Sequence, residues 1–307
     1  MQLREHPVFG RKVFFLNPPF NIRKLVIPVL EEREYEICLI DDYRDAKNIL
    51  RHYPDSICFV SIDNNEQPQL TINQWFNFVE SFSEDTVLST IYTGVLAYRV
   101  PQSKKNLFLL NTAIPAGFTQ TNGSIEDLIE TLTDILDING AKGRRKYVRV
   151  KCTSARLANV TCPLGKKSYA LPIVNISSVG LACSASLEYR TVFAENTLLR
   201  DIAIALNGTL ITCSAAVFSV TERKDSLLIV LLFLKGTPHA AKKLIRRYIF
   251  QSLHEEIVNK IQKEPQDMTE YSKEISLRHT DILSGKTADT EPASDAEDSS
   301  QTITTLF

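Results

Sequence analysis

The sequence has few of the features that mark membrane, secreted or metal-binding proteins. Its longest apolar run, Leu227–Leu234, is far shorter than the roughly twenty residues that a membrane-spanning helix needs. The first fifteen residues contain neither the apolar segment nor the small-residue cleavage site of a secretory signal peptide. No CxxC spacing and no histidine cluster occurs, so the six scattered cysteines argue against a zinc site and favour reduced thiols in the cytoplasm. They are Cys38, Cys58, Cys152, Cys162, Cys183 and Cys213.

Signatures of catalysis are also missing from the sequence. It contains no nucleophile elbow and no phosphate-binding P-loop. His239 and His254 fall in the last predicted helix, where a histidine is more often a surface residue than a general base. We therefore expect a protein that is not an enzyme, with no catalytic residue, no metal and no cofactor.

Charge is distributed unevenly along the 307 residues, although the net charge is only −1. Residues 1–141 carry a net charge of −7, residues 142–262 carry +12, and residues 263–307 carry −6. The middle segment therefore has a positive field suited to an anionic partner. Charge alone does not distinguish a nucleotide from a nucleic acid or an acidic protein.

The first 139 residues alternate short apolar runs with helix-like stretches, a pattern typical of a parallel sheet flanked by helices. The final helix of this region begins with a capping-box pattern, in which Ser124 precedes Asp127 by three residues. Asn139-Gly140 ends it, as is common at a helix C-terminus. Strands are predicted at 12–16, 35–40, 56–62, 87–92 and 107–110, and helices at 21–32, 45–51, 75–82 and 124–139.

This order of strands and helices resembles the receiver domain of response regulators, which has a flavodoxin-like α/β fold. Asp63 follows the third predicted strand, where receivers place their phospho-accepting aspartate. The expected acidic pair after the first strand is replaced by Asn17-Pro18-Pro19, so Mg²⁺ would lack its carboxylates. Ala113-Ile114-Pro115 stands where a receiver has its lysine. The resemblance implies a receiver-like domain over residues 1–139 that lacks phosphorylation chemistry.

After Gly140 the pattern changes to short segments rich in valine, isoleucine, leucine and cysteine. Polar connections separate these segments, which favours an antiparallel barrel. Thr237-Pro238 then begins a helix that we expect to flank the barrel. Residues 263–307 form an acidic tail, largely rich in Ser, Thr, Asp and Glu, for which the composition predicts disorder. The predicted strands are 147–152, 168–174, 181–189, 209–220 and 227–234.

Two motifs stand in this second region, which we delimit as residues 140–262. The first is R-x-x-x-R, from Arg145 to Arg149. The second is N-x-S-x-x-G, formed by Asn175, Ser177 and Gly180 at the end of a predicted strand. In this order and context they resemble the paired signature of PilZ domains, the bacterial receptors for cyclic di-GMP. The resemblance covers about residues 142–262 and implies a β-barrel with a C-terminal helix that binds the dinucleotide.

The residue types suit that ligand, which presents two phosphates and two guanines. An arginine is flat and permanently charged, so it can grip a phosphate or a guanine edge with two hydrogen bonds, or stack on the base. The carbonyl of Asn175 can accept from the guanine N–H groups, and the hydroxyl of Ser177 can donate to a phosphate. Gly180 lets the backbone turn sharply or the ligand come close.

Arg144 occupies the position just before R-x-x-x-R. In PilZ domains an arginine there is associated with two intercalated dinucleotides, which implies two cyclic di-GMP molecules per chain. We expect a downstream protein partner, no nucleic acid and no membrane insertion. Three alternatives stay open at this point: a degenerate PilZ domain that serves as a protein–protein adaptor, a nucleic-acid-binding protein that uses the basic segment, and an enzyme acting through Asp63.

Overall fold

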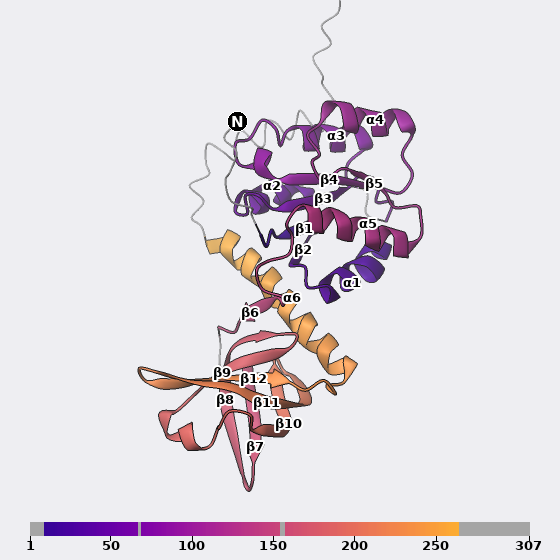
Figure 1. Ribbon diagram of the computed structural model, residues 1–307. Helices are drawn as coiled ribbons and strands as arrows, with labels where there is room; N and C mark the ends of the chain where they lie inside the picture. The colour runs from indigo at the N-terminus through magenta and orange to yellow at the C-terminus, as the bar shows by residue number, and fades with distance from the viewer. Residues whose placement is uncertain (1–8, 67–68, 154–156, 264–307) are drawn as a thin grey trace, which may run out of the picture. The chain divides into compact units, whose positions relative to one another are not determined.

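The computed structural model describes residues 9–66, 69–153 and 157–263. It contains a parallel α/β lobe, built from the elements β1 to α5, and an antiparallel barrel, built from the strands β6 to β12 (Figure 1). The predicted acidic tail, apart from its first residue, lies outside the described residues. Within the described part of the chain, no helix has the length and apolar character needed to cross a membrane.

The α/β lobe is built around a five-stranded parallel sheet in the order β2-β1-β3-β4-β5. This is the flavodoxin-like order expected from the sequence. The central strands β1 and β3 are buried at every residue, which is why they read as unbroken apolar runs rather than as an alternating pattern. The strands are β1 (Val13–Leu16), β2 (Ile37–Ile40), β3 (Ile57–Ser61), β4 (Tyr92–Ala97) and β5 (Phe118–Gln120).

Helices cover both faces of this sheet and create two hydrophobic cores. One core combines η1, α1 and α5 with residues such as Phe15 and Phe59, and the other combines α2, α3 and α4 with residues such as Phe14 and Val60 (Figure 1). Thr71 and Gln74 form a complete capping box at α3, and Ser124 caps α5 as predicted. The helices are η1 (Ile22–Val26), α1 (Ile27–Glu32), α2 (Tyr43–Arg51), α3 (Ile72–Glu80), α4 (Gln102–Asn111) and α5 (Ile125–Ile138).

Two strands of the α/β lobe lie elsewhere than the sequence pattern predicted. Within the segment 87–92, Leu88–Thr90 forms the 3₁₀ turn η2, because Asp85 accepts hydrogen bonds from the backbone N–H groups of Val87 and Leu88. The fourth strand follows this turn and contains Gly94, whose missing Cβ makes room for the ring of Phe59. The strand was missed in the sequence because a glycine lowers the strand character of its segment.

The segment 107–110, predicted as the fifth strand, belongs instead to helix α4. Phe108 is buried whereas Leu110 is 80% exposed, so the apolar run occupies more than one side of the helix. Thr121 is the residue that follows the true fifth strand. No lysine therefore follows the fifth strand, as predicted. The prediction, however, examined Ala113-Ile114-Pro115, which does not follow a strand.

The barrel consists of six antiparallel strands closed by the pairing of β8 with β9, and β6 joins it as an additional strand beside β8. The amino-terminal half of the long strand β8 pairs with β7 and its carboxyl-terminal half with β9, which closes the ring. The inward-facing residues form one core with η3 (Leu187–Thr191) nearby. The strands are β6 (Arg149–Lys151), β7 (Ala158–Leu164), β8 (Lys167–Ser177), β9 (Gly180–Ala185), β10 (Leu198–Leu206), β11 (Thr209–Arg223) and β12 (Ser226–Phe233).

Two of these strands, β7 and β10, were not predicted from the sequence. β10 contains an irregularity between Leu199 and Ile202, and Asp201 there has a positive φ of 52°. An irregularity of this kind interrupts the two-residue alternation by which a strand is recognised. β7 contains Pro163, which lowers the strand character of its segment.

The closing helix α6 (His239–Lys263) contributes to both cores. Its first half supplies residues such as Ile245 and Ile249 to the barrel core, as expected for a flanking helix. Further along, Ile257 is buried in the core of the α/β lobe. This helix therefore packs against both lobes.

Candidate functional site

The pairing of β6 with β8 brings the two sequence motifs together. Arg149 lies directly opposite Ser177, and Lys151 lies opposite Asn175. Between them, Val150 and Ile176 form a pair that faces the core. Because side chains alternate between the two faces of a strand, Arg149, Asn175 and Ser177 share the face opposite to Val150 and Ile176.

The motif residues differ in how accessible they are. Arg144, Arg145 and Arg149 are all exposed, and Asn175 is partly exposed. Ser177 is buried, and its hydroxyl donates to the backbone oxygen of Gly180 at 3.0 Å. The arginines are thus available to a ligand in this state, whereas the Ser177 hydroxyl stabilises the turn from β8 to β9.

Gly180 is required by the packing of its own strand. A Cβ at this position would lie 2.3 Å from the backbone oxygen of Leu231 on the paired strand β12. Gly180 does not have a positive φ, so the left-handed conformation that favours glycine is not the reason for it. The glycine therefore allows β9 and β12 to approach each other, a role that the sequence did not reveal; its predicted role beside a ligand stays a prediction.

A cavity of about 490 Å³ opens beside the motifs, a size within the usual range of small-molecule sites. Six basic and two acidic side chains line it, so its field is positive. Arg145 lines this cavity, whereas Arg144, Arg149 and Asn175 are not among its lining residues. The lining residues are Glu32, Arg33, Glu34, Lys142, Gly143, Arg145, Lys146, Tyr147, Ser178, Val179, Lys242 and Arg246.

Helix α6 contributes two basic residues that the sequence motifs did not reveal. Lys242 and Arg246 are one helical turn apart, so both reach the cavity. Arg246 is partly buried and lies 3.4 Å from a carboxylate oxygen of Glu32. A basic pair spaced by four residues within a positively charged segment was the only signal in the sequence. It was not distinguishable from an ordinary solvated helix face.

Glu34 connects the α/β lobe to both motifs. Its Oε2 accepts from the backbone N–H of Val148 at 2.9 Å, and its Oε1 accepts from the hydroxyl of Ser178 at 2.6 Å. Val148 belongs to R-x-x-x-R, and Ser178 belongs to N-x-S-x-x-G. No local sequence signal pointed to Glu34, because this contact joins residues more than a hundred positions apart.

The receiver-like edge of the parallel sheet is occupied by polar contacts. Both oxygens of Asp63 accept from the backbone N–H of Tyr98, at 2.9 and 2.7 Å, and Oδ2 also accepts from Arg99 at 2.8 Å. These N–H groups directly follow β4. The carboxylate of Asp63 therefore holds the end of β4 close to the end of β3.

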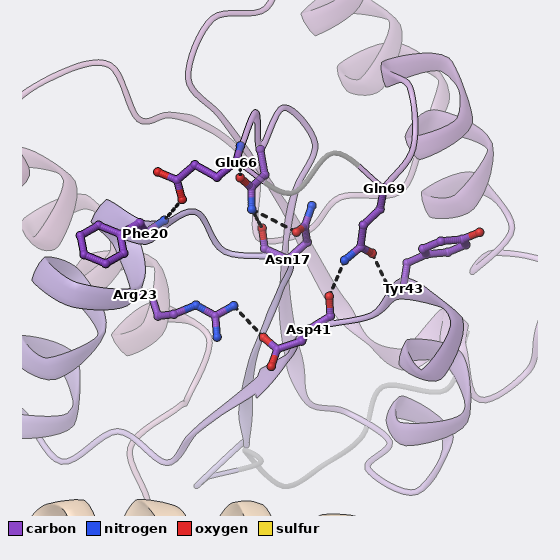
Figure 2. A network of polar contacts seen from close by, with 8 residues as sticks. Asn17, Phe20, Arg23, Asp41, Tyr43, Glu66 and Gln69 are labelled. Carbon is purple, nitrogen blue, oxygen red and sulfur yellow. Dashed lines mark hydrogen bonds and ion pairs between the residues drawn. The ribbon is translucent and has the colours of Figure 1, made fainter.

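Figure 2 shows the network at the neighbouring strand ends, where Asn17 follows β1. The side chain of Asn64 donates to the backbone and side-chain oxygens of Asn17, at 3.1 and 3.0 Å. The Arg23 guanidinium pairs with Asp41, and Gln69 donates to the backbone of that same residue (Figure 2). Asn17 therefore brings an amide to the strand end where the resemblance to receivers predicted a carboxylate.

The donor set at this edge does not fit the Mg²⁺ of a receiver. Mg²⁺ requires several oxygen ligands in octahedral geometry, but Asp63 is held by backbone N–H groups. The amide nitrogen of Asn17 is buried without a hydrogen-bond partner, and it cannot ligate a cation. Among the described residues, no group of three or more His, Cys, Asp or Glu side chains is arranged to hold a metal.

Comparisons with known proteins find similarity at the level of structure. No family model and no curated protein matches the chain. The PilZ domain of YcgR from Escherichia coli with cyclic di-GMP is 17% identical, with a TM-score of 0.35, over 39% of this chain and 99% of that one. YcgR in complex with cyclic di-GMP, also from Escherichia coli, is 21% identical, with a TM-score of 0.32, over 40% of this chain and 51% of that one.

The chemotaxis protein CheY4 from Vibrio cholerae is 21% identical, with a TM-score of 0.34, over 41% of this chain and 98% of that one. Each of these matches covers about two fifths of this chain. The strand order and the order of elements show a five-stranded parallel α/β lobe, followed by an antiparallel barrel and a C-terminal helix.

Proposed function

We propose that this protein is a receptor for cyclic di-GMP and that the dinucleotide binds at the two motifs on the barrel. The observation that carries the proposal is the β6–β8 pairing, which sets Arg149 opposite Ser177 beside a basic cavity. Two motifs that are 26 residues apart in sequence, from Arg149 to Asn175, thereby become one surface.

Each motif residue has a distinct role in this proposal. Arg145 and Arg149 grip phosphates or stack on guanines, since exposed guanidinium groups can do both. Asn175, on the same face, accepts from a guanine edge. Ser177 and Gly180 hold the turn that presents Ser178 to the cavity. Arg144 offers a further guanidinium for a second dinucleotide, which extends the proposal to two ligands per chain.

Ligand binding acts through the arrangement of the two lobes in this proposal. Residues 1–139 form the receiver-like domain, residues 140–262 form the receptor domain, and residues 263–307 form the acidic tail. The cavity is lined by Glu32 at the end of α1 and by the next two residues, as well as by motif residues, so a ligand there alters contacts of the receiver-like domain. The protein thus serves as an effector that passes the signal to a protein partner, without an enzymatic step.

Isothermal titration calorimetry of the pure protein with cyclic di-GMP tests the proposal. Arg145→Ala and Arg149→Ala should each lose about 1–3 kcal/mol of binding free energy, while circular dichroism shows an unchanged fold because both side chains are exposed. Arg200→Ala is the matched control, since Arg200 is an exposed arginine on β10, outside both motifs. Its titration should match that of the unmodified protein.

The same titrations measure how many cyclic di-GMP molecules bind to one chain. A ratio of two per chain is expected, and Arg144→Leu should lower it toward one without abolishing binding. If the motif variants and the unmodified protein gave the same binding curve, the proposed site would be refuted. If neither the unmodified protein nor any variant released heat on titration, the protein–protein adaptor would be the better function.

A further inference from the structure

Glu34 adopts a backbone conformation that a glutamate rarely has. Helix α1 ends in a Schellman motif, in which Tyr35 N–H bonds to the Leu30 oxygen at 3.2 Å and Glu34 N–H bonds to the Glu31 oxygen at 3.0 Å. Glu34 occupies the C′ position of this motif with a φ of 66°, where glycine is the favoured residue. Local folding alone would therefore not select a glutamate here.

The side chain of Glu34 makes contacts that account for its presence. Its two carboxylate oxygens accept hydrogen bonds from Val148 and Ser178, one donor from each motif. Ser178 is buried, so its hydroxyl would lack a partner if the carboxylate left without a replacement. A backbone N–H and a hydroxyl that converge on two anionic oxygens are also what a phosphate would use.

We propose that Glu34 is an internal competitor of the ligand, whose carboxylate occupies donors that a phosphate of cyclic di-GMP takes when it binds. This inference rests on the proposed function and specifies its regulation. Without ligand, Glu34 holds Val148 and Ser178 through its two hydrogen bonds, which together we call the latch. The ligand binds after or as the carboxylate leaves. Binding then replaces one anion by another at Val148 and Ser178, and it releases the end of α1 from the motifs.

Two features of the surroundings support an exchange of anions. The cavity is lined by more basic than acidic side chains, so it stabilises a carboxylate and would equally stabilise a phosphodiester, which also carries one negative charge. The other acidic lining residue, Glu32, contacts Arg246 and His239 on α6 instead of the motif donors. Glu34 is therefore the carboxylate that must move for a phosphate to reach both donors.

The test compares Glu34→Gln and Glu34→Gly with Glu32→Gln as the matched control. Calorimetry with cyclic di-GMP measures affinity, and hydrogen exchange in the free protein measures protection of the Val148 amide. Both Glu34 variants should bind about tenfold more tightly, since the competing contact is weakened or removed. Glu32→Gln removes the same charge from the same cavity but leaves the Val148 and Ser178 donors occupied, so it should tighten binding clearly less than Glu34→Gln does.

Several outcomes separate this inference from the proposed function. Unchanged affinity in both Glu34 variants, with normal binding by the unmodified protein, overturns the latch and leaves the receptor function standing. An equal gain in Glu32→Gln also overturns it, because the effect would then come from charge alone. Equal exchange of the Val148 amide in Glu34→Gly and in the unmodified protein shows that no latch holds it. Binding by the Glu34 variants alone supports the latch strongly, whereas no binding by any variant refutes both proposals.

Discussion

Polar side chains around the two motifs already have partners in the free protein. The Ser177 hydroxyl bonds to Gly180, and the Ser178 hydroxyl bonds to Glu34. Both serines are buried, so each hydroxyl needs such a partner to avoid the cost of an unsatisfied polar group. A ligand that engages this turn must therefore exchange existing hydrogen bonds, whereas the exposed arginines can bind it without losing any such buried bond.

Gly180→Ala should destabilise the barrel, because the new methyl group would lie 2.3 Å from the backbone oxygen of Leu231. Overpacking against backbone typically costs about 1–3 kcal/mol. Urea denaturation measures the change in the free energy of unfolding. Gly236→Ala is the control, since a Cβ there meets no atom within 4 Å. If both variants were equally stable, the close approach of β9 and β12 would not be the reason for Gly180.

Strand ends in the α/β lobe are held by hydrogen bonds to polar side chains. Asp63 follows β3, at the expected place, yet its oxygens hold the backbone beyond β4. Asn17 follows β1 with a positive φ of 51° and contacts Asn64. Asparagine tolerates this conformation better than most residues. The edge thus favours a structural role over phosphoryl transfer.

Incubation with acetyl phosphate and Mg²⁺ should leave Asp63 unmodified, because the carboxylates that would bind the metal are missing at Asn17-Pro18-Pro19. Intact-protein mass spectrometry detects the added phosphoryl group. Asp63→Asn should instead lower the stability of the lobe by about 1–3 kcal/mol, since a neutral amide is a weaker acceptor for the N–H groups after β4. Stoichiometric phosphorylation that Asp63→Asn abolishes would contradict the structural role.

Contacts between distant segments link the two lobes of the molecule. Helix α6 places Ile257 in the core of the α/β lobe, and its Arg246 pairs with Glu32 at the end of α1. Glu31 is close to the same arginine. Burial, opposed by Arg246 and helped by the neighbouring Glu32, raises the pKa of Glu31 to about 7. Stability should therefore depend on whether Glu31 is protonated.

The sign follows from proton binding. The raised pKa means that the folded state holds a proton on Glu31 that the unfolded state releases at lower pH. Its contribution to stability is full below pH 4.5 and is lost as the pH rises to about 7, an effect of about 3 kcal/mol. The difference in unfolding free energy between Glu31→Gln and the unmodified protein should therefore grow in favour of the variant from pH 5 to pH 8. A constant difference, measured by urea denaturation, would show that Glu31 titrates normally.

Local signals in the sequence determined much of the fold and the content of the motifs. Burial on both faces makes β1 and β3 unbroken apolar runs, and Ser124 caps α5 through its own neighbour Asp127. These features depend on residues a few positions apart, so they can be read without a structure. The same holds for the identities of Arg145, Arg149, Asn175 and Gly180, whose roles as ligand contacts stay predictions.

Only the tertiary structure decided features that depend on residues far apart in the chain. The β4 strand was not predicted, because a glycine such as Gly94 is unusual in a strand. Its presence is explained only by the ring of Phe59 on another strand, which leaves no room for a side chain. Gly180 is needed by Leu231, and Arg246 reaches the cavity from the last helix. Glu34 meets both motifs through contacts that span more than a hundred residues. Neither its charge nor its neighbours in the sequence predict this contact. A hydrogen bond depends on the positions of atoms in space, and only the packing of the two lobes brings these atoms together.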